Sequence, residues 1–149
     1  MKNLSMFCLS LYPEHLNNLK KINYIPVGLG MKNFNNHWIK DNTFHNISNK
    51  NKYYGEYTFH YWFWKNMIDE ISDKDWIGFC AYRRYWANKS YPNTNKLSKI
   101  INNNNFHKYV LKDVKKYWFN YETILGEKIP FGKVKLSKII KNGGIKSII

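Results

Sequence analysis

The sequence predicts an α/β fold in which a mainly parallel sheet is flanked by helices, a Rossmann-like arrangement. Three short apolar runs, residues 6–11, 24–30 and 76–82, have the length and composition of strands. Two stretches of helical character, residues 14–21 and 54–72, separate these runs. Strands that alternate with helices are typical of parallel sheets, because a helix carries the chain back to the edge where the next strand begins.

The first two predicted strands end in turn residues. Residues 6–11 run into Pro13, and the second apolar run contains Gly28 and Gly30 near its end. The polar, Asn-rich residues 31–52 that follow are interpreted as a loop.

The longest periodic stretch predicts one amphipathic helix over residues 54–72. Aromatic and aliphatic side chains recur there at helical spacing, at Tyr54, Tyr57, Tyr61, Trp64 and Ile68, and the apolar face is widened by Phe59, Trp62 and Phe63. Residues 73–75 predict a turn. The continuous apolar run 76–82 is typical of a strand buried on both faces.

The remaining sequence has weaker signals. Residues 88–105 are interpreted as a connecting segment, residues 117–125 as a strand ending at Gly126, and residues 134–149 have helix-like spacing. The length of 149 residues predicts one domain.

Charge and cysteine content set limits on compartment and partners. The net charge is +14, and residues 89–149 hold thirteen lysines against three acids. Such a surface attracts nucleic acid, acidic lipid headgroups or phosphorylated ligands. Cys8 and Cys80 lie in apolar runs, which predicts buried free thiols. No apolar run approaches the ~20 residues that cross a bilayer, so we expect a cytoplasmic protein.

Two arginines, Arg83 and Arg84, follow the predicted buried strand directly. Ligands of open α/β sheets bind beyond the carboxyl ends of the strands, and guanidinium groups match phosphate oxygens. One hypothesis is therefore that both arginines bind a nucleotide diphosphate. The alternative is that they pair with Glu56 or Asp41, or extend into solvent.

The predicted helix offers polar side chains near its start and along one face. Glu56 and Thr58 lie at the start, and Tyr61 is four residues before Lys65. This polar stripe could line a sugar pocket, or the helix could simply cover the core. The five histidines make no metal-binding pattern, and the chain has neither a P-loop nor a GxGxxG motif.

Residues 41–86 carry a combination of short motifs that resembles a known bacterial family. The motifs are Asp41-Asn42-Thr43, Asn46-Ile47-Ser48, Tyr61-Trp62-Phe63-Trp64-Lys65-Asn66, and Tyr82-Arg83-Arg84-Tyr85. The family was long labelled a domain of unknown function. Its members occur among capsular and exopolysaccharide biosynthesis proteins and are classed with GT-A-type glycosyltransferases.

The resemblance implies a GT-A-like hexosyltransferase that moves a sugar from a nucleotide-sugar donor to a glycan or lipid-linked acceptor. It implies donor contacts from Asn51, Thr58, Tyr61, Lys65, Asn66, Tyr82, Arg83 and Arg84, with Glu56 as the candidate acid/base. GT-A enzymes usually hold Mg²⁺ or Mn²⁺ with an Asp-x-Asp pair after a central strand. Here Asp73-Lys74-Asp75 precedes the strand, so no metal ligand is assigned.

The sequence departs from the family pattern at several positions. Phe44 replaces a glycine, Tyr57 a leucine and Ala81 a histidine. Family domains also continue beyond this length, so residues 1–149 are interpreted as the N-terminal portion of a longer glycosyltransferase-like domain.

Two other functions stay open from the sequence. A basic, aromatic chain could be a nucleic-acid-binding module, although no such motif is present and no nucleic acid is expected. The chain could also be a non-catalytic remnant that contacts an anionic membrane, at its inner face, through the basic C-terminal region.

Overall fold

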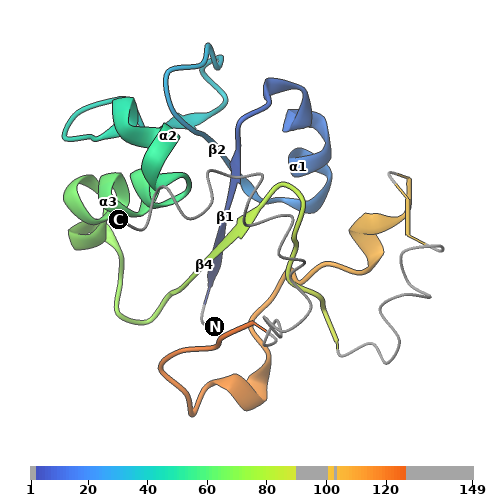
Figure 1. Cartoon of the computed structure of the whole chain (residues 1–149). Coiled ribbons are helices and arrows are strands. Elements are labelled where there is room, and N and C mark those ends of the chain that lie inside the picture. Colours follow the sequence, from blue (N-terminus) through green and yellow to red (C-terminus); the bar gives the residue numbers. More distant parts are fainter. Residues whose placement is uncertain (1–2, 90–100, 103, 127–149) are drawn as a thin grey trace, which may run out of the picture.

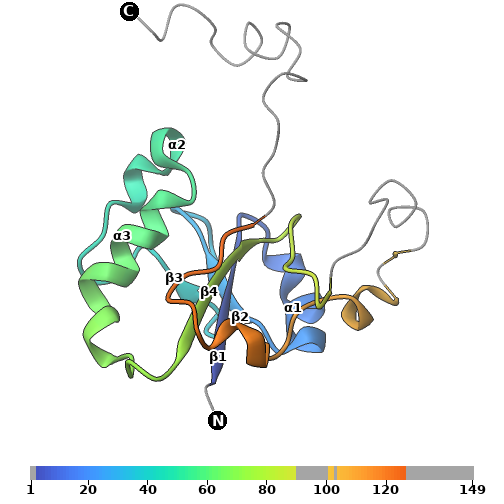
Figure 2. The ribbon, with the colours of Figure 1, turned by 90° about the horizontal axis from the view of Figure 1, so that it is seen from below.

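The computed structural model describes residues 3–89, 101–102 and 104–126, and its centre is a four-stranded parallel sheet (Figure 1). In spatial order the strands are β3 (Ile39–Lys40), β2 (Ile25–Gly28), β1 (Leu4–Ser10) and β4 (Trp76–Ala81). Helix α1 (Leu16–Ile22) lies on one side of this sheet, and α2 (Asn51–Tyr54) and α3 (Tyr57–Asn66) lie on the other (Figure 2). The predicted α/β fold with a parallel sheet flanked by helices is confirmed.

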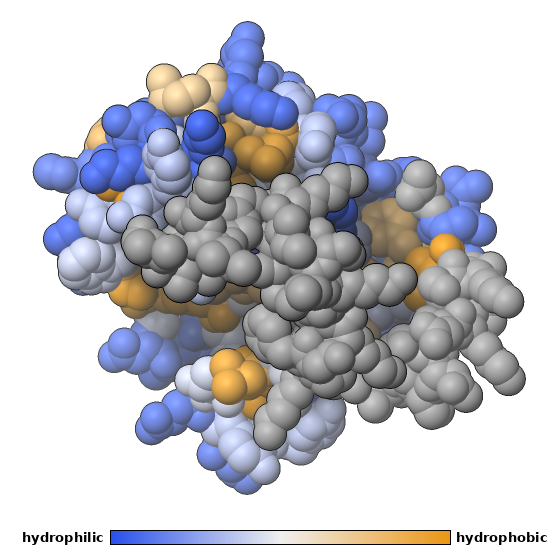
Figure 3. Space-filling model, in the orientation of Figure 1, coloured by the Kyte–Doolittle hydropathy of each residue, from blue (hydrophilic) through white to orange (hydrophobic). Residues whose placement is uncertain are grey.

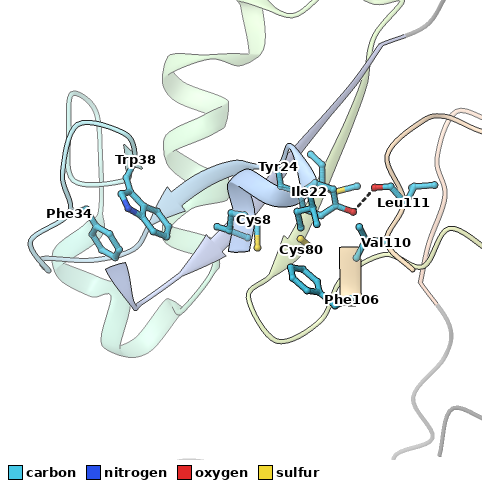
Figure 4. Packing of buried hydrophobic residues seen from close by; sticks show 11 residues of the cluster. Cys8, Ile22, Tyr24, Phe34, Trp38, Cys80, Phe106, Val110 and Leu111 are labelled. Atoms are coloured by element: carbon cyan, nitrogen blue, oxygen red, sulfur yellow. Dashed lines mark hydrogen bonds between the residues drawn. The ribbon is translucent and has the colours of Figure 1, made fainter. Parts of the chain in front are cut away.

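Strand β1 is central because it pairs with β2 on one side and β4 on the other. Its last five residues are buried. Alternate side chains enter two separate cores, as the pleat of a strand requires. The α1-side core contains Met6, Cys8, Leu19, Ile22, Tyr24 and Cys80, part of which Figure 4 shows. The α3-side core contains Phe7, Leu9, Val27, Phe59, Trp62 and Phe63.

Aromatic rings fill the α3-side core. The Phe7 ring lies 5.1 Å from that of Phe63 in an edge-on arrangement and 5.8 Å from that of Phe79 in a stacked one. Such pairs add about 0.5–1.5 kcal/mol each beyond the area that they bury. Because these rings come from β1, α3 and β4, they fix the helix against the sheet.

The two thiols lie on neighbouring strands in the α1-side core (Figure 4). Cys8 and Cys80 are register partners, and both are buried and free. Contact with Cys8 and burial raise the pKa of the Cys80 thiol, with a smaller contribution from the Glu56 carboxylate. The prediction of buried free thiols is confirmed.

The predicted helix over residues 54–72 is wrong in its bounds. The chain forms α2, breaks at Gly55, forms α3, and ends in the 3-10 turn Ile68–Glu70. Gly55 has φ 54°, a conformation that L side chains rarely adopt, so the helix cannot pass through it unbroken.

The expected buried face of this helix is also wrong. Tyr54, Tyr57 and Trp64 are exposed, and the buried residues of α3 are Thr58, Phe59, Trp62 and Phe63. Apolar side chains recur at helical spacing both on the exposed face and on the buried face of α3. Spacing alone therefore does not indicate which face packs on the sheet.

Two further expectations need correction. Residues 31–52, interpreted as loop, contain β3 and the 3-10 turn Ser48–Lys50, because a two-residue strand is too short to show a pattern. Residues 117–125 form no strand and begin instead within the 3-10 turn Lys116–Trp118. The turn at residues 73–75 and a strand at 76–81 agree with the sequence. The expected burial of this strand on both faces is wrong, because β4 lies at the edge of the sheet and only its residue Cys80 is buried. The helix-like residues 134–149 lie outside the described residues.

The chain after β4 returns across the α1 side of the sheet (Figure 2). Ala87 bridges Val110, and the Tyr24 hydroxyl donates to the Leu111 carbonyl at 2.6 Å (Figure 4). Burial raises the pKa of Tyr24, which keeps the phenol protonated as the donor of this bond.

No helix in the described part of the chain is both long and apolar enough to cross a membrane. On the face in Figure 3, small hydrophobic areas interrupt a largely hydrophilic surface wherever grey atoms do not cover it.

Substitution of Gly28, at the end of β2, tests how tightly the residues around this position pack. A Cβ placed there would lie 2.5 Å from Cγ of the buried Phe34 ring, so Gly28→Ala must displace a rigid side chain. We expect a loss of about 1–3 kcal/mol in the free energy of unfolding, measured with urea. Gly126→Ala, where a Cβ meets nothing within 4 Å, is the matched control. Equal effects of both substitutions would contradict the packing described here.

Candidate functional site

All four strands end at one edge of the sheet because they are parallel. The loops that follow Ser10, Gly28, Lys40 and Ala81 therefore meet at this carboxyl edge. Ligands of open α/β sheets bind at this place. Tyr82, Arg83 and Arg84 follow β4 directly and so lie at this edge, as the sequence predicts.

The segments after β1, β2 and β4 form a cluster of aromatic and basic side chains, here called the edge cluster: Tyr12, His15, Lys32, Tyr82 and Arg83. The rings of His15 and Tyr82 stack, with centroids 4.6 Å apart and planes 21° apart. Tyr12 meets Tyr82 edge-on at 5.2 Å. The Arg83 guanidinium lies 5.0 Å from the Tyr82 centroid, and Lys32 Nζ lies 4.7 Å from that of Tyr12.

The buried Ser10 holds the edge cluster in place. Its Oγ accepts a hydrogen bond from the Tyr12 backbone N–H at 2.9 Å and lies 2.9 Å from Nδ1 of His15. One hydroxyl at the last position of β1 thus fixes both the turn at Tyr12 and the orientation of the His15 ring. The stacked His15–Tyr82 pair is consequently formed before any ligand arrives.

Arg83 and Arg84 are exposed and make no ion pair with any described carboxylate. The backbone turns back after β4, since the Arg84 N–H donates to the Ala81 carbonyl at 2.8 Å. The alternative in which the arginines pair with Glu56 or Asp41 is therefore wrong. Both guanidinium groups have donors open to solvent at the carboxyl edge.

Asp41 is fully buried and is used to hold the loops together. Its Oδ1 accepts from the Gly30 N–H at 2.7 Å, and its Oδ2 accepts from the Thr58 hydroxyl at 2.5 Å. Asn51 Nδ2 donates to the same Thr58 oxygen at 2.9 Å and to the Gly55 carbonyl. Burial raises the Asp41 pKa, and the hydrogen bonds from Thr58 and Gly30 oppose this shift. Thr58 and Asn51, predicted as donor contacts, thus fasten the start of α3 to the loops after β2 and β3.

Glu56 is exposed at the first turn of the α3 region. Burial lowers the pKa of His60, and the negative charge of Glu56 opposes this shift. The same charge contributes to the raised pKa of Cys80. Glu56 lies four residues, about one helical turn, before His60. Its exposure leaves the carboxylate accessible to a ligand at the carboxyl edge.

The other predicted contacts on α3 lie farther away. Asn66 is eight residues, about 12 Å, along the helix from Thr58. Its side chain bonds the His45 backbone, while Lys65 Nζ lies 3.8 Å above the Trp64 ring. Tyr61 packs edge-on against Trp64 at 6.0 Å. The structure does not bring Tyr61, Lys65 or Asn66 into contact with the described arginines.

Sequence reasoning missed Tyr12, His15 and Lys32. A signal was present for Tyr12, which follows the predicted strand 6–11 as directly as Arg83 follows the predicted strand 76–82. His15 lies three residues farther along the chain. Only the strand order, which puts β1 beside β4, makes these loops neighbours.

In the described part of the chain, β4 is followed by Tyr82-Arg83-Arg84 and not by an Asp-x-Asp pair. No group of three His, Cys, Asp or Glu side chains suited to a metal ion occurs among the residues that the structure describes. Asp41 has both oxygens bonded within the protein, and Asp73 and Asp75 lie at the opposite end of β4. The positively charged side chains described at this edge are Lys32, Arg83 and Arg84.

Comparison with known proteins identifies one family. A family model described as "Domain of unknown function (DUF4422)" matches residues 11–131. No curated protein and no solved structure matches the chain. The matched range includes every residue of the edge cluster.

The bond between Thr58 and Asp41 gives a stability test of this edge. Thr58→Val keeps the shape but removes the hydroxyl, which leaves a buried carboxylate oxygen without its donor. We expect the free energy of unfolding to fall by about 1–3 kcal/mol in urea titrations. Thr123→Val, at an exposed position, should change it by less than about 0.5 kcal/mol. A Thr58→Val protein as stable as the control would show that this bond is not structural.

Proposed function

We propose, from the premise that this chain belongs to the DUF4422 family, that it is a glycosyltransferase acting on a nucleotide-sugar donor. The donor binds at the carboxyl edge of the sheet, and the acceptor is a growing surface polysaccharide, as a glycan or a lipid-linked chain. The observation that carries the proposal is the edge cluster, where a preformed aromatic stack lies beside Arg83. Arg84 is the next residue in the chain, and neither arginine pairs with a described carboxylate.

The edge cluster has the two features that a nucleoside diphosphate requires. A nucleobase presents a flat π-face, and the Tyr12, His15 and Tyr82 rings offer surfaces of the same kind. A diphosphate presents oxygens that accept forked hydrogen bonds from guanidinium groups. Arg83 is held against Tyr82 at 5.0 Å, so the base and phosphate contacts lie next to each other.

In the proposed transfer step, charge changes at the acceptor oxygen and at the leaving diphosphate, and Glu56, Arg83 and Arg84 respond to these changes. The bond from the sugar anomeric carbon to the diphosphate oxygen breaks, and a bond from that carbon to the acceptor oxygen forms. The acceptor hydroxyl gives its proton to the Glu56 carboxylate, and the diphosphate leaves with the electron pair of the broken bond. Arg83 and Arg84 stabilise the negative charge that develops on this leaving group.

The proposed lipid-linked acceptor implies that the protein acts at a membrane surface. A lipid-linked acceptor lies at the inner face of a membrane, and residues 89–149 carry thirteen lysines that attract anionic headgroups. Peripheral binding of a cytoplasmic enzyme to that surface would bring donor and acceptor together.

A second candidate function is supported by the exposed aromatic residues of α2 and α3. Tyr53, Tyr54 and Tyr57 are 80%, 51% and 71% exposed, and Lys52 Nζ lies 5.7 Å from the Tyr53 centroid. Aromatic side chains beside lysines bind single-stranded nucleic acid by stacking and charge. Binding of this kind would be insensitive to Arg83 and Arg84 but would weaken in Tyr53→Ser.

The arginines give the main test of the donor site. Arg83→Ala or Arg84→Ala should weaken uridine or guanosine diphosphate binding at least tenfold, roughly 1.4 kcal/mol, in calorimetric titrations. Lys74→Ala, which removes an exposed charge before β4, is the matched control and should have no effect. Lys65→Ala tests the contacts expected on α3.

Unchanged nucleotide binding in both arginine variants would refute the donor site. Loss in Lys65→Ala alone would move the donor to the face of α3. Salt-dependent oligonucleotide binding without nucleotide binding would favour the second candidate function.

The aromatic stack gives a separate test. Tyr82→Leu removes the ring that packs on His15, whereas Tyr82→Phe keeps it. We expect Tyr82→Leu to weaken uridine diphosphate binding about tenfold, within the ~1–3 kcal/mol measured for base stacking, and Tyr82→Phe to bind normally. Inorganic pyrophosphate, which has no base, should bind both variants equally. Equal losses for pyrophosphate and the nucleotide would show that Tyr82 does not contact the base.

A further inference from the structure

A hollow lies at the opposite end of the sheet from the edge cluster. It has a volume of ≈ 570 Å³, within the range of small-ligand sites. Leu4, Met6 and Gly78 line it at the amino-terminal halves of β1 and β4, and residues 118–124 pass over it. A Cβ at Gly78 would lie 2.5 Å from Cε of Met6, so the absence of a side chain at Gly78 leaves room for the end of the Met6 side chain.

Three tryptophans give this cavity flat, rigid walls. The Trp86 indole N–H donates to the Phe79 carbonyl at 2.8 Å, which fixes that ring. The rings of Trp76 and Trp118 are 6.3 Å apart with planes 37° apart. Trp118 sits in the 3-10 turn Lys116–Trp118, which the Trp118 N–H closes by donating to the Lys115 carbonyl at 2.9 Å. The indole surfaces are therefore in place without a ligand.

The polar groups of the cavity are acidic or neutral. Asp73, Asp75 and Glu122 line it together with Asn120 and Thr123, and among the residues that the structure describes no lysine, arginine or histidine lines it. Asp75 accepts one bond from the Asn3 N–H at 3.3 Å, while Asp73 and Glu122 have no partner among the described residues. This lining contrasts with the net charge of +14 for the whole chain.

We propose that this cavity binds a glycan whose sugar rings carry no acidic group. A pyranose has an apolar C–H face that packs on an indole, and hydroxyl groups that donate to carboxylate oxygens. The lining of the cavity offers both kinds of surface. Its uncompensated carboxylates repel uronic acids and other anionic sugars at the same time. Neutral sugars and amino sugars are the class that fits.

This site stands apart from the proposed donor site. β1 has seven residues, so its two ends are roughly 20 Å apart, and the cavity and the edge cluster lie at opposite ends. None of the residues that line the cavity belongs to the edge cluster. Glycan binding here would hold a chain against the protein whether or not the carboxyl edge takes a nucleotide.

The test is a titration of the whole protein with four neutral oligosaccharides, of glucose, galactose, mannose and N-acetylglucosamine, and with an oligogalacturonate. Binding is followed by tryptophan fluorescence and by saturation-transfer NMR. We expect at least one neutral oligosaccharide to bind with a dissociation constant near ~1 mM, and the oligogalacturonate not to compete. Trp118→Ala should weaken binding at least tenfold, while Trp118→Phe, which keeps a ring, should retain most of it.

Two controls separate this site from the others. Trp64→Ala, an exposed tryptophan on the other side of the sheet, should leave glycan binding unchanged. Arg83→Ala should reduce nucleotide binding but not glycan binding, so the two proposals can fail independently. Asp73→Asn with Glu122→Gln should let the oligogalacturonate compete.

Three results would overturn the proposal. The first is that no neutral oligosaccharide binds. The second is that binding persists in a folded Trp118→Ala protein. The third is that tetramethylammonium ions bind in the cavity and saccharides do not, which would make it an aromatic site for a cation.

Discussion

The structure depends on burying one strand, β1, on both faces and pairing it along both edges. Parallel strands need cover on each face, so α1 and α3 must pack on opposite sides of the sheet. Because β1 stands between β2 and β4, its last residue, Ser10, is delivered to the middle of the carboxyl edge. The position of every candidate ligand contact follows from this arrangement.

Buried polar groups at the carboxyl edge hold the loops in place, whereas the exposed polar groups are accessible to a ligand. Asp41, Thr58 and Asn51 join the start of α3 to the loops after β2 and β3. Ser10 fixes the His15 ring. The side chains that carry unpaired positive charge, Arg83 and Arg84, are exposed instead. A rigid base under open guanidinium groups reduces the ordering cost of binding a charged ligand.

The two ends of the sheet differ in charge, and this difference separates two kinds of ligand. The carboxyl edge presents Lys32, Arg83 and Arg84, which suit phosphate groups. The cavity at the amino end presents indole rings and carboxylates without a cation. A nucleotide donor and an uncharged glycan would therefore be sorted to opposite ends by electrostatics, in a chain whose net charge is +14.

The sequence alone determined the fold class, the strand at 76–81 and the place of Arg83 and Arg84 after it, because each depends on a local run of side chains. Only the tertiary structure decided which stripe of α3 is buried, that residues 117–125 form no strand, and that Tyr12 and His15 meet Tyr82. These features depend on which strands are neighbours and which faces are covered. Such contacts join residues about seventy positions apart, and no local periodicity records them.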